Sequence, residues 1–312
     1  MEGITDIPYR KTIAELDPAW DYLCTDFYRV PTVGNIRPAH IIRHLGDLFY
    51  NDEKLKVKTI FQILTSPNAQ TEQAVKMIQE LAIPYLDLNI GCPSRKVNAH
   101  HGGSYLLTVP EDLQKIVKII RKNFTGRFSV KMRVGYHDDS NFIENLKMLE
   151  GEGVELITLH ARTKKELYKG IANWEYIKKA KETLSIPLVG NGDIWSTNDI
   201  DKVINKTMCD HIMIGRGALK TPWLASVYRN QLDKKSQQQF TEEMIGKYFD
   251  LLEKNYFEEM KDANLVLKRF KAVSRYIFDD FTNGEEIKKN CLRTKSLDNF
   301  KHQLTLIETL KF

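Results

Sequence analysis

Strand-like and helix-like segments alternate along this 312-residue chain from its start to about residue 228. The strand-like segments are short and apolar, and amphipathic segments separate most of them. Regular alternation of this kind indicates right-handed βα units around a parallel sheet. We expect strands at 22–27, 57–64, 85–90, 128–133, 155–160, 187–191 and 211–215. We expect helices at 69–81, 110–122, 141–150, 174–183 and 197–204.

A closed barrel is the architecture that this alternation favours. No Gly-x-Gly-x-x-Gly motif follows the first expected strand, which argues against a dinucleotide-binding sheet. A (β/α)8 TIM barrel needs eight strands, one more than the seven found here. The segment Met1-Glu2-Gly3 resembles the end of a strand whose beginning is absent. The sequence therefore predicts an α/β fold, a (β/α)8 barrel over residues 1–230 with its first strand truncated.

A second, helical domain is expected over residues 241–312. Residues 230–240 are polar and typical of a linker, and only helical periodicity follows, with a helix opening at Thr241. Within 262–278 an apolar stripe consists of Val266, Phe270, Val273 and Ile277. A basic stripe on another face of the same helix consists of Lys268, Lys271 and Arg275.

Composition excludes several classes of protein. No stretch of eighteen apolar residues exists, so no membrane span is expected, and the N-terminus does not resemble a signal peptide. Four cysteines lie far apart without a Cys-x-x-Cys pair, which argues against a disulfide framework and a zinc site and fits a cytoplasmic protein. We expect no metal. The formal net charge of +5 is compatible with a polyanionic partner but does not establish one.

One cysteine stands out by its surroundings. Asp87-Leu88-Asn89-Ile90-Gly91-Cys92-Pro93-Ser94 places the Cys92 thiol on a tight turn at the carboxyl end of an expected strand. In parallel sheets this edge carries the chemistry, and a thiol held there is able to act as an acid, a base or a nucleophile. The alternative is a buried structural cysteine, which is the commoner case for an isolated cysteine. The preceding Asn and the rigid Gly-Cys-Pro turn favour a chemical role.

Polar side chains recur at or just after the ends of the expected strands. Because strand ends converge on one mouth of a barrel, we expect these side chains to meet. Each one alone has a plainer explanation, such as a surface amide or a core histidine. The set consists of Gln62, Asn89, Lys131 with Arg133, His160 with Arg162, Asn191 with Asp193, and Gly215 with Arg216.

The last two strands also predict a phosphate site. Gly190-Asn191-Gly192-Asp193 and Gly215-Arg216-Gly217 follow them, where barrels of this type commonly bind phosphate. Glycines let backbone N–H groups approach an anion, and a helix N-terminus adds partial positive charge. We expect Gly192, Gly215 and Arg216 around a ligand phosphate, and two ordinary glycine turns are the alternative.

These residues together resemble the tRNA-dihydrouridine synthases. The resemblance runs in order from residue 1 to about 220, and the helical tail matches the second domain of that family in position and type. Asn-x-Gly-Cys-Pro is the most diagnostic element, and the length and the run Asp26-Phe27-Tyr28-Arg29-Val30 resemble the bacterial C subfamily, which acts on uridine 16 of the D-loop. The matching stretches are residues 1–6, 87–93, 130–135, 159–163, 190–194 and 214–217.

The resemblance implies a flavoenzyme that uses FMN in the barrel mouth and NADPH as reductant. It implies that Met1 and Gln62 contact the flavin ring and that Lys131 and His160 hydrogen-bond it. Hydride then passes from flavin N5 to C6 of the uracil, and Cys92 supplies the proton to C5. An acid must start protonated, so the ordinary thiol pKa of about 8.5 suits this role. The phosphate and remaining cofactor contacts would come from Asn191, Gly192, Asp193, Gly215 and Arg216.

The substrate contacts are expected at the mouth and on the tail. Asn89 is able to donate to and accept from the uracil edge, Arg133 faces either the uracil or a phosphate, and Tyr168 stacks on a base. The target base must be extruded, so the protein must hold tRNA elsewhere as well. For the tail stripe, a solvated helix face is an equal alternative. The basic residues proposed for tRNA binding are Arg29, Arg37, Arg95, Lys96, Lys268, Lys271 and Arg275.

Two departures from the family pattern leave rival functions open. Nothing precedes Met1 where the family has an apolar strand, and His100-His101-Gly102-Gly103 is bulkier than usual. One rival is a flavoenzyme of the same fold that acts on free pyrimidines, such as a dihydroorotate or dihydropyrimidine dehydrogenase. The other is a tRNA-binding protein without catalysis. We expect a monomer.

Overall fold

The computed structural model describes residues 3–307, and these fall into two compact units. The sheet unit comprises Tyr22–Ile194 and Asn198–Ile214. The helical unit comprises Met1–Asp21, Trp195–Thr197 and Gly215–Phe312. Each unit is described by itself.

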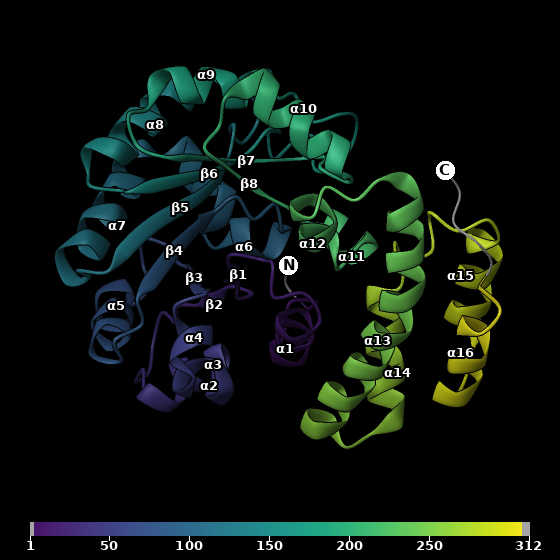
Figure 1. Cartoon of the computed structure of the whole chain (residues 1–312). Coiled ribbons are helices and arrows are strands. Elements are labelled where there is room, and N and C mark those ends of the chain that lie inside the picture. Colours follow the sequence, from purple (N-terminus) through teal and green to yellow (C-terminus); the bar gives the residue numbers. More distant parts are fainter. Residues whose placement is uncertain (1–2, 308–312) are drawn as a thin grey trace. The chain divides into compact units, whose positions relative to one another are not determined.

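The sheet unit contains one parallel sheet in which neighbours in sequence are neighbours in space (Figure 1). Every pairing is parallel, as expected for consecutive βα units. Among the described residues no pairing joins β8 to β1, so the sheet is a partial barrel. The strands are β1 (Leu23–Cys24), β2 (Tyr28–Arg29), β3 (Thr59–Leu64), β4 (Tyr85–Ile90), β5 (Arg127–Arg133), β6 (Leu156–His160), β7 (Leu188–Asn191) and β8 (His211–Met213).

The first expected strand is interrupted by a bulge. Cys24 pairs with Ile60 and Tyr28 pairs with Ile63, so β1 and β2 follow the same partner, β3, with one extra residue between them. The Thr25 hydroxyl accepts the backbone N–H of Gln62 at 3.0 Å and replaces a missing ladder bond. The bulge therefore lies directly beside one of the predicted site residues.

Helices cover the outer side of the sheet, and α5, α7, α8 and α9 lie along it in Figure 1. In α7, Leu113, Ile116, Val117 and Ile120 recur at helical spacing and are buried, while the opposite face is charged. All five expected helices are present, and α2, α3, α4 and α6 are additional. The helices of this unit are α2 (Pro38–Leu45), α3 (Asp47–Asn51), α4 (Glu53–Lys56), α5 (Thr71–Glu80), α6 (Arg95–Ala99), the 3₁₀ helix η1 (Gly103–Thr108), α7 (Pro110–Asn123), α8 (Phe142–Gly151), α9 (Glu175–Thr183) and α10 (Thr197–Thr207), whose first residue belongs to the other unit.

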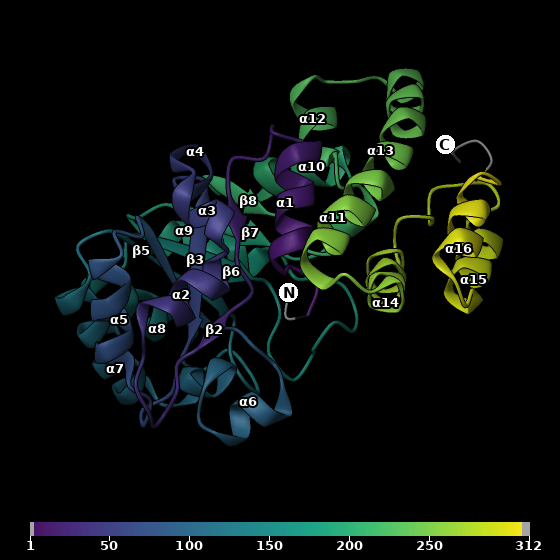
Figure 2. The ribbon, with the colours of Figure 1, turned by 90° about the horizontal axis from the view of Figure 1, so that it is seen from below.

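The helical unit is built around its longest helix, α13, against which α1 packs (Figure 2). Asp6 caps the N-terminus of α1 and also accepts the Tyr256 hydroxyl of α13 at 2.9 Å. Among the described residues no helix is both long and apolar enough to cross a membrane. The helices are α1 (Ile7–Leu16), α11 (Gly217–Lys220), α12 (Leu224–Arg229), α13 (Lys234–Met260), α14 (Ala263–Val273), α15 (Gly284–Arg293) and α16 (Leu297–Leu304).

Two predictions about the tail were wrong. The segment 230–240 is mostly helix, because Asp233 caps α13 through the Ser236 N–H and the Lys and Gln residues that follow are good helix formers. The basic stripe does not lie on one helix, since α14 ends at Val273 and Arg275 follows in a turn. The apolar stripe of this segment is buried as expected.

The expected N-terminal strand end falls on residues 1 and 2, which lie outside the described residues, and on Gly3, which is in a turn.

Candidate active site at the strand ends

The register of the sheet sets polar side chains side by side in two rows. Asn89 of β4 pairs with Lys131 of β5. Further along the strands, Arg133 of β5 pairs with His160 of β6, and His160 pairs with Asn191 of β7. The prediction that strand-end residues come together is therefore met for these five, on four neighbouring strands.

The turn that carries Cys92 is fixed by the Asn just before it. Asn89 Oδ1 accepts the Gly91 N–H at 3.0 Å, and Asn89 Nδ2 donates to Gln62 Oε1 at 2.7 Å. The amide is thus used on both sides for local structure, with one N–H and one lone pair left for a ligand. The Cys92 residue itself is half-buried.

Three donors converge on the backbone carbonyl of Cys92. Asn98 Nδ2 donates to it at 3.0 Å, the Ser104 N–H at 3.2 Å, and Ser104 Oγ lies 2.9 Å away. Both side chains are buried, and Ser104 Oγ also lies 2.9 Å from Asn98 Oδ1. Gly103 makes this approach possible, because its φ is +60° and an added Cβ would lie 2.9 Å from the Cys92 oxygen. We call Asn98 and Ser104 the carbonyl clamp.

A buried carboxylate orients the Gln62 side chain. Gln62 Nε2 donates to Asp87 Oδ2 at 2.8 Å, and Ser129 Oγ donates to Asp87 Oδ1 at 2.6 Å. Burial raises the pKa of Asp87, while the hydrogen bonds from Ser129 and Gln62 and the charge of Lys131 oppose that rise. Gln62 is held between Asp87 and Asn89 rather than free to turn.

The Lys131 amine has a strongly shifted pKa. Burial and the neighbouring Arg133 guanidinium lower the pKa of the Lys131 amine to about 8, against the opposing influence of Asp87 and of the Cys24 and Cys92 thiols. The Cys92 thiol therefore lies within electrostatic range of Lys131. An amine that is costly to charge at this position gains from an anionic or acceptor partner.

Arg133 does not point to solvent. It is 1% exposed, and its Nε donates to the Gly91 carbonyl at 3.0 Å while Nη1 donates to the Thr163 and Leu167 carbonyls at 3.0 and 2.9 Å. Its guanidinium also lies 5.4 Å from the Tyr168 ring. These contacts argue against the predicted direct contact with substrate. Arg133 instead ties the Cys92 turn to the loop after β6.

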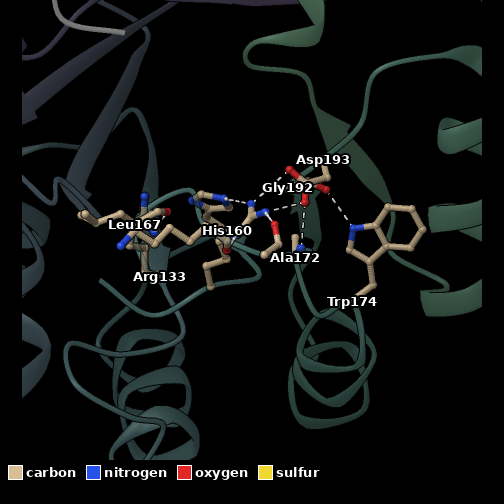
Figure 3. Close-up of polar contacts among 10 residues, drawn as sticks. Arg133, His160, Leu167, Ala172, Trp174, Gly192 and Asp193 are labelled. Carbon is tan, nitrogen blue, oxygen red and sulfur yellow. Dashed lines mark hydrogen bonds and ion pairs between the residues drawn. The ribbon is translucent and has the colours of Figure 1, made fainter. Parts of the chain in front are cut away.

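A second buried arginine, Arg162, takes up the Asp193 carboxylate. Its Nη1 and Nη2 donate to Asp193 Oδ1 and Oδ2 at 3.1 and 2.5 Å, and Nη1 lies 3.5 Å from His160 Nε2. The Ala172 N–H also donates to Asp193 Oδ2, at 2.8 Å. Figure 3 shows His160 and Asp193 on one side of Arg133 and Leu167, with the Ala172 backbone and the Trp174 indole beside Asp193 and Gly192. The Asp193 side chain is therefore engaged by protein, and only its backbone suits the predicted phosphate contact.

Gly192 allows the backbone to lie against His160. Its φ is +126°, and a Cβ there would meet Ala172 Cβ at 2.8 Å and His160 Cδ2 at 3.1 Å. The Trp174 indole donates to the Gly192 carbonyl at 2.8 Å and fixes the turn from the other side. This close approach is to His160 and Ala172, and the predicted approach of Gly192 to a phosphate stays a prediction.

The other predicted cofactor residues have mixed outcomes. Asn191 Nδ2 donates to the Met213 carbonyl at 2.7 Å and ties β7 to β8. Gly215 and Arg216 belong to the helical unit, where the Arg216 guanidinium lies 4.9 Å from the Trp195 ring, and their role at a phosphate stays a prediction. Met1 lies outside the described residues.

The predicted tRNA contacts also differ among themselves. Lys271 is half-buried, and its amine donates to the Thr294 carbonyl at the end of α15, so a free basic group was the wrong expectation there. Tyr168 is 54% exposed beside His160. The exposed residues are Arg29, Arg37, Arg95, Lys96, Lys268 and Arg275.

Four residues that shape the site were not assigned a role from the sequence. Asp87 carried a signal, a lone charge within an apolar strand, and Arg162 lay in the quoted strand end. Asn98 and Ser104 gave none, because their partner is a backbone carbonyl that no sequence pattern reveals.

Comparisons with known proteins identify the family of this chain. A sequence model of the dihydrouridine synthase (Dus) family matches residues 1–311. The chain belongs to the dihydrouridine synthase family. It is 35% identical to a tRNA-dihydrouridine(16) synthase of Shewanella oneidensis over 237 residues, 73% of each chain. It is 29% identical to a tRNA-dihydrouridine(16) synthase of Haemophilus influenzae over 313 residues, 97% of each chain.

A solved structure shares the fold. The 6-hydroxypseudooxynicotine amine oxidase of Pseudomonas geniculata superposes with a TM-score of 0.53 over 77% of this chain, at 12% identity. This chain spans about half of that protein, 47% of its length. The similarity supports the α/β barrel-like architecture and nothing further.

Proposed function

We propose that this protein reduces a uridine of tRNA, uridine 16 in the D-loop, to 5,6-dihydrouridine. The observation that carries the proposal is the Cys92 thiol, held on a rigid turn at the end of β4 within electrostatic range of Lys131. The family and the tRNA-dihydrouridine(16) synthases named above support the choice of reaction and of base. In this proposal the barrel expected over 1–230 carries the chemistry, and the helical domain expected over 241–312 binds tRNA.

The described residues fit a flavin. Gln62, Lys131 and His160 offer donors on three strands of one sheet edge, and Gly192 brings backbone close to His160 where a side chain would clash. Burial lowers the pKa of the Lys131 amine, and a hydrogen-bond acceptor of the flavin would stabilise the charged form of this amine. We propose that these four residues hold FMN. When bound, FMN would supply the hydride for the uracil ring, and NADPH would reduce the flavin again.

Cys92 supplies the proton in this scheme. Hydride addition at C6 places negative charge at C5, and an S–H group presented there donates its proton to complete the saturated bond. The carbonyl clamp holds the Cys92 backbone without adding a charge beside the thiol. Asn89 keeps one N–H and one lone pair for the uracil edge.

The substrate must reach the site as an extruded base. Extrusion costs a few kcal/mol and is cheapest in an RNA loop, which favours the D-loop as the target. A cytoplasmic monomer that binds tRNA through exposed Arg and Lys side chains completes the proposal.

The test compares substrates and maps the product. Purified protein with FMN and NADPH is offered unmodified tRNA or free uridine, and dihydrouridine is located by mass spectrometry. We expect product at uridine 16 of tRNA and none from the nucleoside. Product from free pyrimidine would favour the free-pyrimidine reductase, and tRNA binding without flavin absorbance or product would favour a binding protein.

A further inference from the structure

The loop after β6, residues 163–172, displays apolar side chains to solvent. Leu167, Tyr168 and Ile171 are 40%, 54% and 85% exposed. Single exposed apolar residues are ordinary on protein surfaces. Three within five residues form a small apolar surface, which we call the apolar tip.

The backbone of the apolar tip is fixed from inside the protein. Arg133 Nη1 donates to the Leu167 carbonyl at 2.9 Å, and Arg162 Nη2 donates to the Gly170 carbonyl at 2.6 Å. Both arginines are 1% exposed. Leu167 itself is held at φ +55°, a conformation that non-glycine residues rarely adopt. The loop is therefore built to keep its apolar side chains outside.

The apolar tip is continuous with the candidate active site. The Tyr168 ring centroid lies 6.2 Å from that of His160, and the Arg133 guanidinium lies 5.4 Å from the Tyr168 ring. Arg133 also donates to the Gly91 carbonyl, next to Cys92. A base that enters beside Cys92 has this loop as a neighbour.

Charge indicates the kind of partner. Lys165 and Lys169 are exposed within the same loop, on the two sides of Tyr168 in sequence. Apolar and aromatic side chains interleaved with cations suit a single-stranded nucleic acid, whose bases stack while its phosphates meet the cations. Apolar side chains placed against unstacked bases are an established device of nucleic-acid-binding proteins.

We propose that the apolar tip is a wedge that takes the place of the extruded base in the RNA loop. The inference rests on the proposed function. When the target base leaves its stack, Ile171 covers the neighbouring base that is left exposed, and Lys165 and Lys169 contact the flanking phosphates. The wedge thereby shifts the equilibrium toward the extruded base.

The experiment uses tRNA in which 2-aminopurine replaces the target uridine, because its fluorescence rises when the base unstacks. Ile171→Ser is compared with Met208→Ser, a matched control that removes a 69% exposed apolar side chain from the segment just before β8, at the other edge of the sheet. We expect Ile171→Ser to lower the fluorescence at saturating protein and to lower kcat/KM on unmodified tRNA about tenfold. Met208→Ser should match wild type in both.

Flavin absorbance and thermal midpoint serve as folding controls and should be equal in all three proteins. Wild-type fluorescence and kcat/KM in Ile171→Ser, or an equal loss in Met208→Ser, would overturn the wedge. A wild-type protein that raises the fluorescence but makes no dihydrouridine would refute the proposed function and leave the wedge supported. Dihydrouridine formed without any rise in fluorescence would support the proposed function and overturn the wedge.

Discussion

Two loops that follow the carboxyl ends of strands in the same sheet are fixed by different kinds of group, one mainly by neutral side chains and the other by guanidinium groups. The Cys92 turn, after β4, is held at its carbonyl by the neutral Asn98 and Ser104 side chains. The loop 163–172, after β6, is held by the guanidinium groups of Arg133 and Arg162. Arg133 leaves β5, the strand between them, and its third contact reaches the Cys92 turn at Gly91.

The difference follows from what each loop has to do in the proposed function. A cation bonded at a thiol lowers its pKa and removes the proton that a general acid needs. Neutral donors on the carbonyl fix the turn without adding a further charge to those of Lys131 and Arg133, which already act on the thiol electrostatically. The loop 163–172 carries no general acid in the proposed function, and its proposed partner is a polyanion. The buried Arg133 and Arg162 fix its backbone, and the exposed Lys165 and Lys169 complement the proposed ligand.

The largest expected effect is at the thiol. Cys92→Ala should lower product formation by about 10²–10⁴-fold, the usual contribution of a positioned general acid, while flavin and tRNA binding persist. Single-turnover assays and flavin absorbance measure the two separately. Cys24→Ala removes the other thiol in electrostatic range of Lys131 and should stay close to wild type. Near-normal turnover of Cys92→Ala would show that the proton comes from another group.

The next largest effect is expected at Arg162, one of the two arginines that hold the loop 163–172. Asp193→Asn leaves the buried Arg162 without its carboxylate and should cost about 3 kcal/mol in the free energy of unfolding, measured with urea. Lys206→Gln breaks the exposed 2.9 Å pair with Glu175 and should change nothing measurable. Equal effects would mean that Arg162 is satisfied by carbonyls alone.

On the neutral side, Ser104→Ala removes one donor from the carbonyl clamp. We expect kcat to fall about tenfold with KM unchanged, because a lost hydrogen bond is worth about 1.4 kcal/mol and the substrate contacts remain. Thr108→Val is the control, since Thr108 lies in the same 3₁₀ helix and its exposed hydroxyl donates only to the Tyr105 carbonyl. A rise in KM at constant kcat would place Ser104 in substrate binding instead.

The pH dependence of the free energy of unfolding tests the buried Lys131 amine independently of the two loops. Because the pKa of its amine is about 8 in the folded chain and about 10.4 when unfolded, the unfolded chain binds more protons between these values, and stability rises with pH there. Lys131→Met should therefore stabilise the flavin-free protein at pH 7, and the gain should shrink between about pH 8 and pH 10. Urea unfolding at pH 7 and 9.5 measures this, and a gain that does not change with pH would contradict the buried cation.

The sequence predicted the sheet because the hydrophobic residues of strands and of amphipathic helices recur with different periods. These periods can be read from a single sequence. It did not predict the bulge beside Gln62, which depends on pairing with β3, or the extension of α13 to Lys234, where a polar run resembles both a linker and an exposed helix. Short helices such as α6 carry too few residues for a period.

For the candidate site, the positions of residues were predictable and the directions of their side chains were not. Strand ends locate residues in register, so Asn89 lies beside Lys131, and Arg133 lies beside His160, on neighbouring strands as expected. The direction of a side chain was not predictable, because Arg133 was expected to face either the uracil or a phosphate and instead bonds backbone carbonyls. Backbone acceptors have no sequence signature, and any residue type supplies them.

The smallest effect concerns the tail, where the structure separates cations that the sequence grouped. Lys268 and Arg275 are exposed, whereas the Lys271 amine is bonded to the Thr294 carbonyl. Lys268→Ala with Arg275→Ala should reduce the slope of log affinity for tRNA against log salt by about 1 to 2, because each phosphate contact releases roughly one counterion. Lys271→Met should leave the slope unchanged and lower the thermal midpoint, because the carbonyl loses its donor. A slope that falls in Lys271→Met as much as in the double variant would mean that this amine leaves Thr294 for the RNA, and the tail would then bind tRNA as the sequence first predicted.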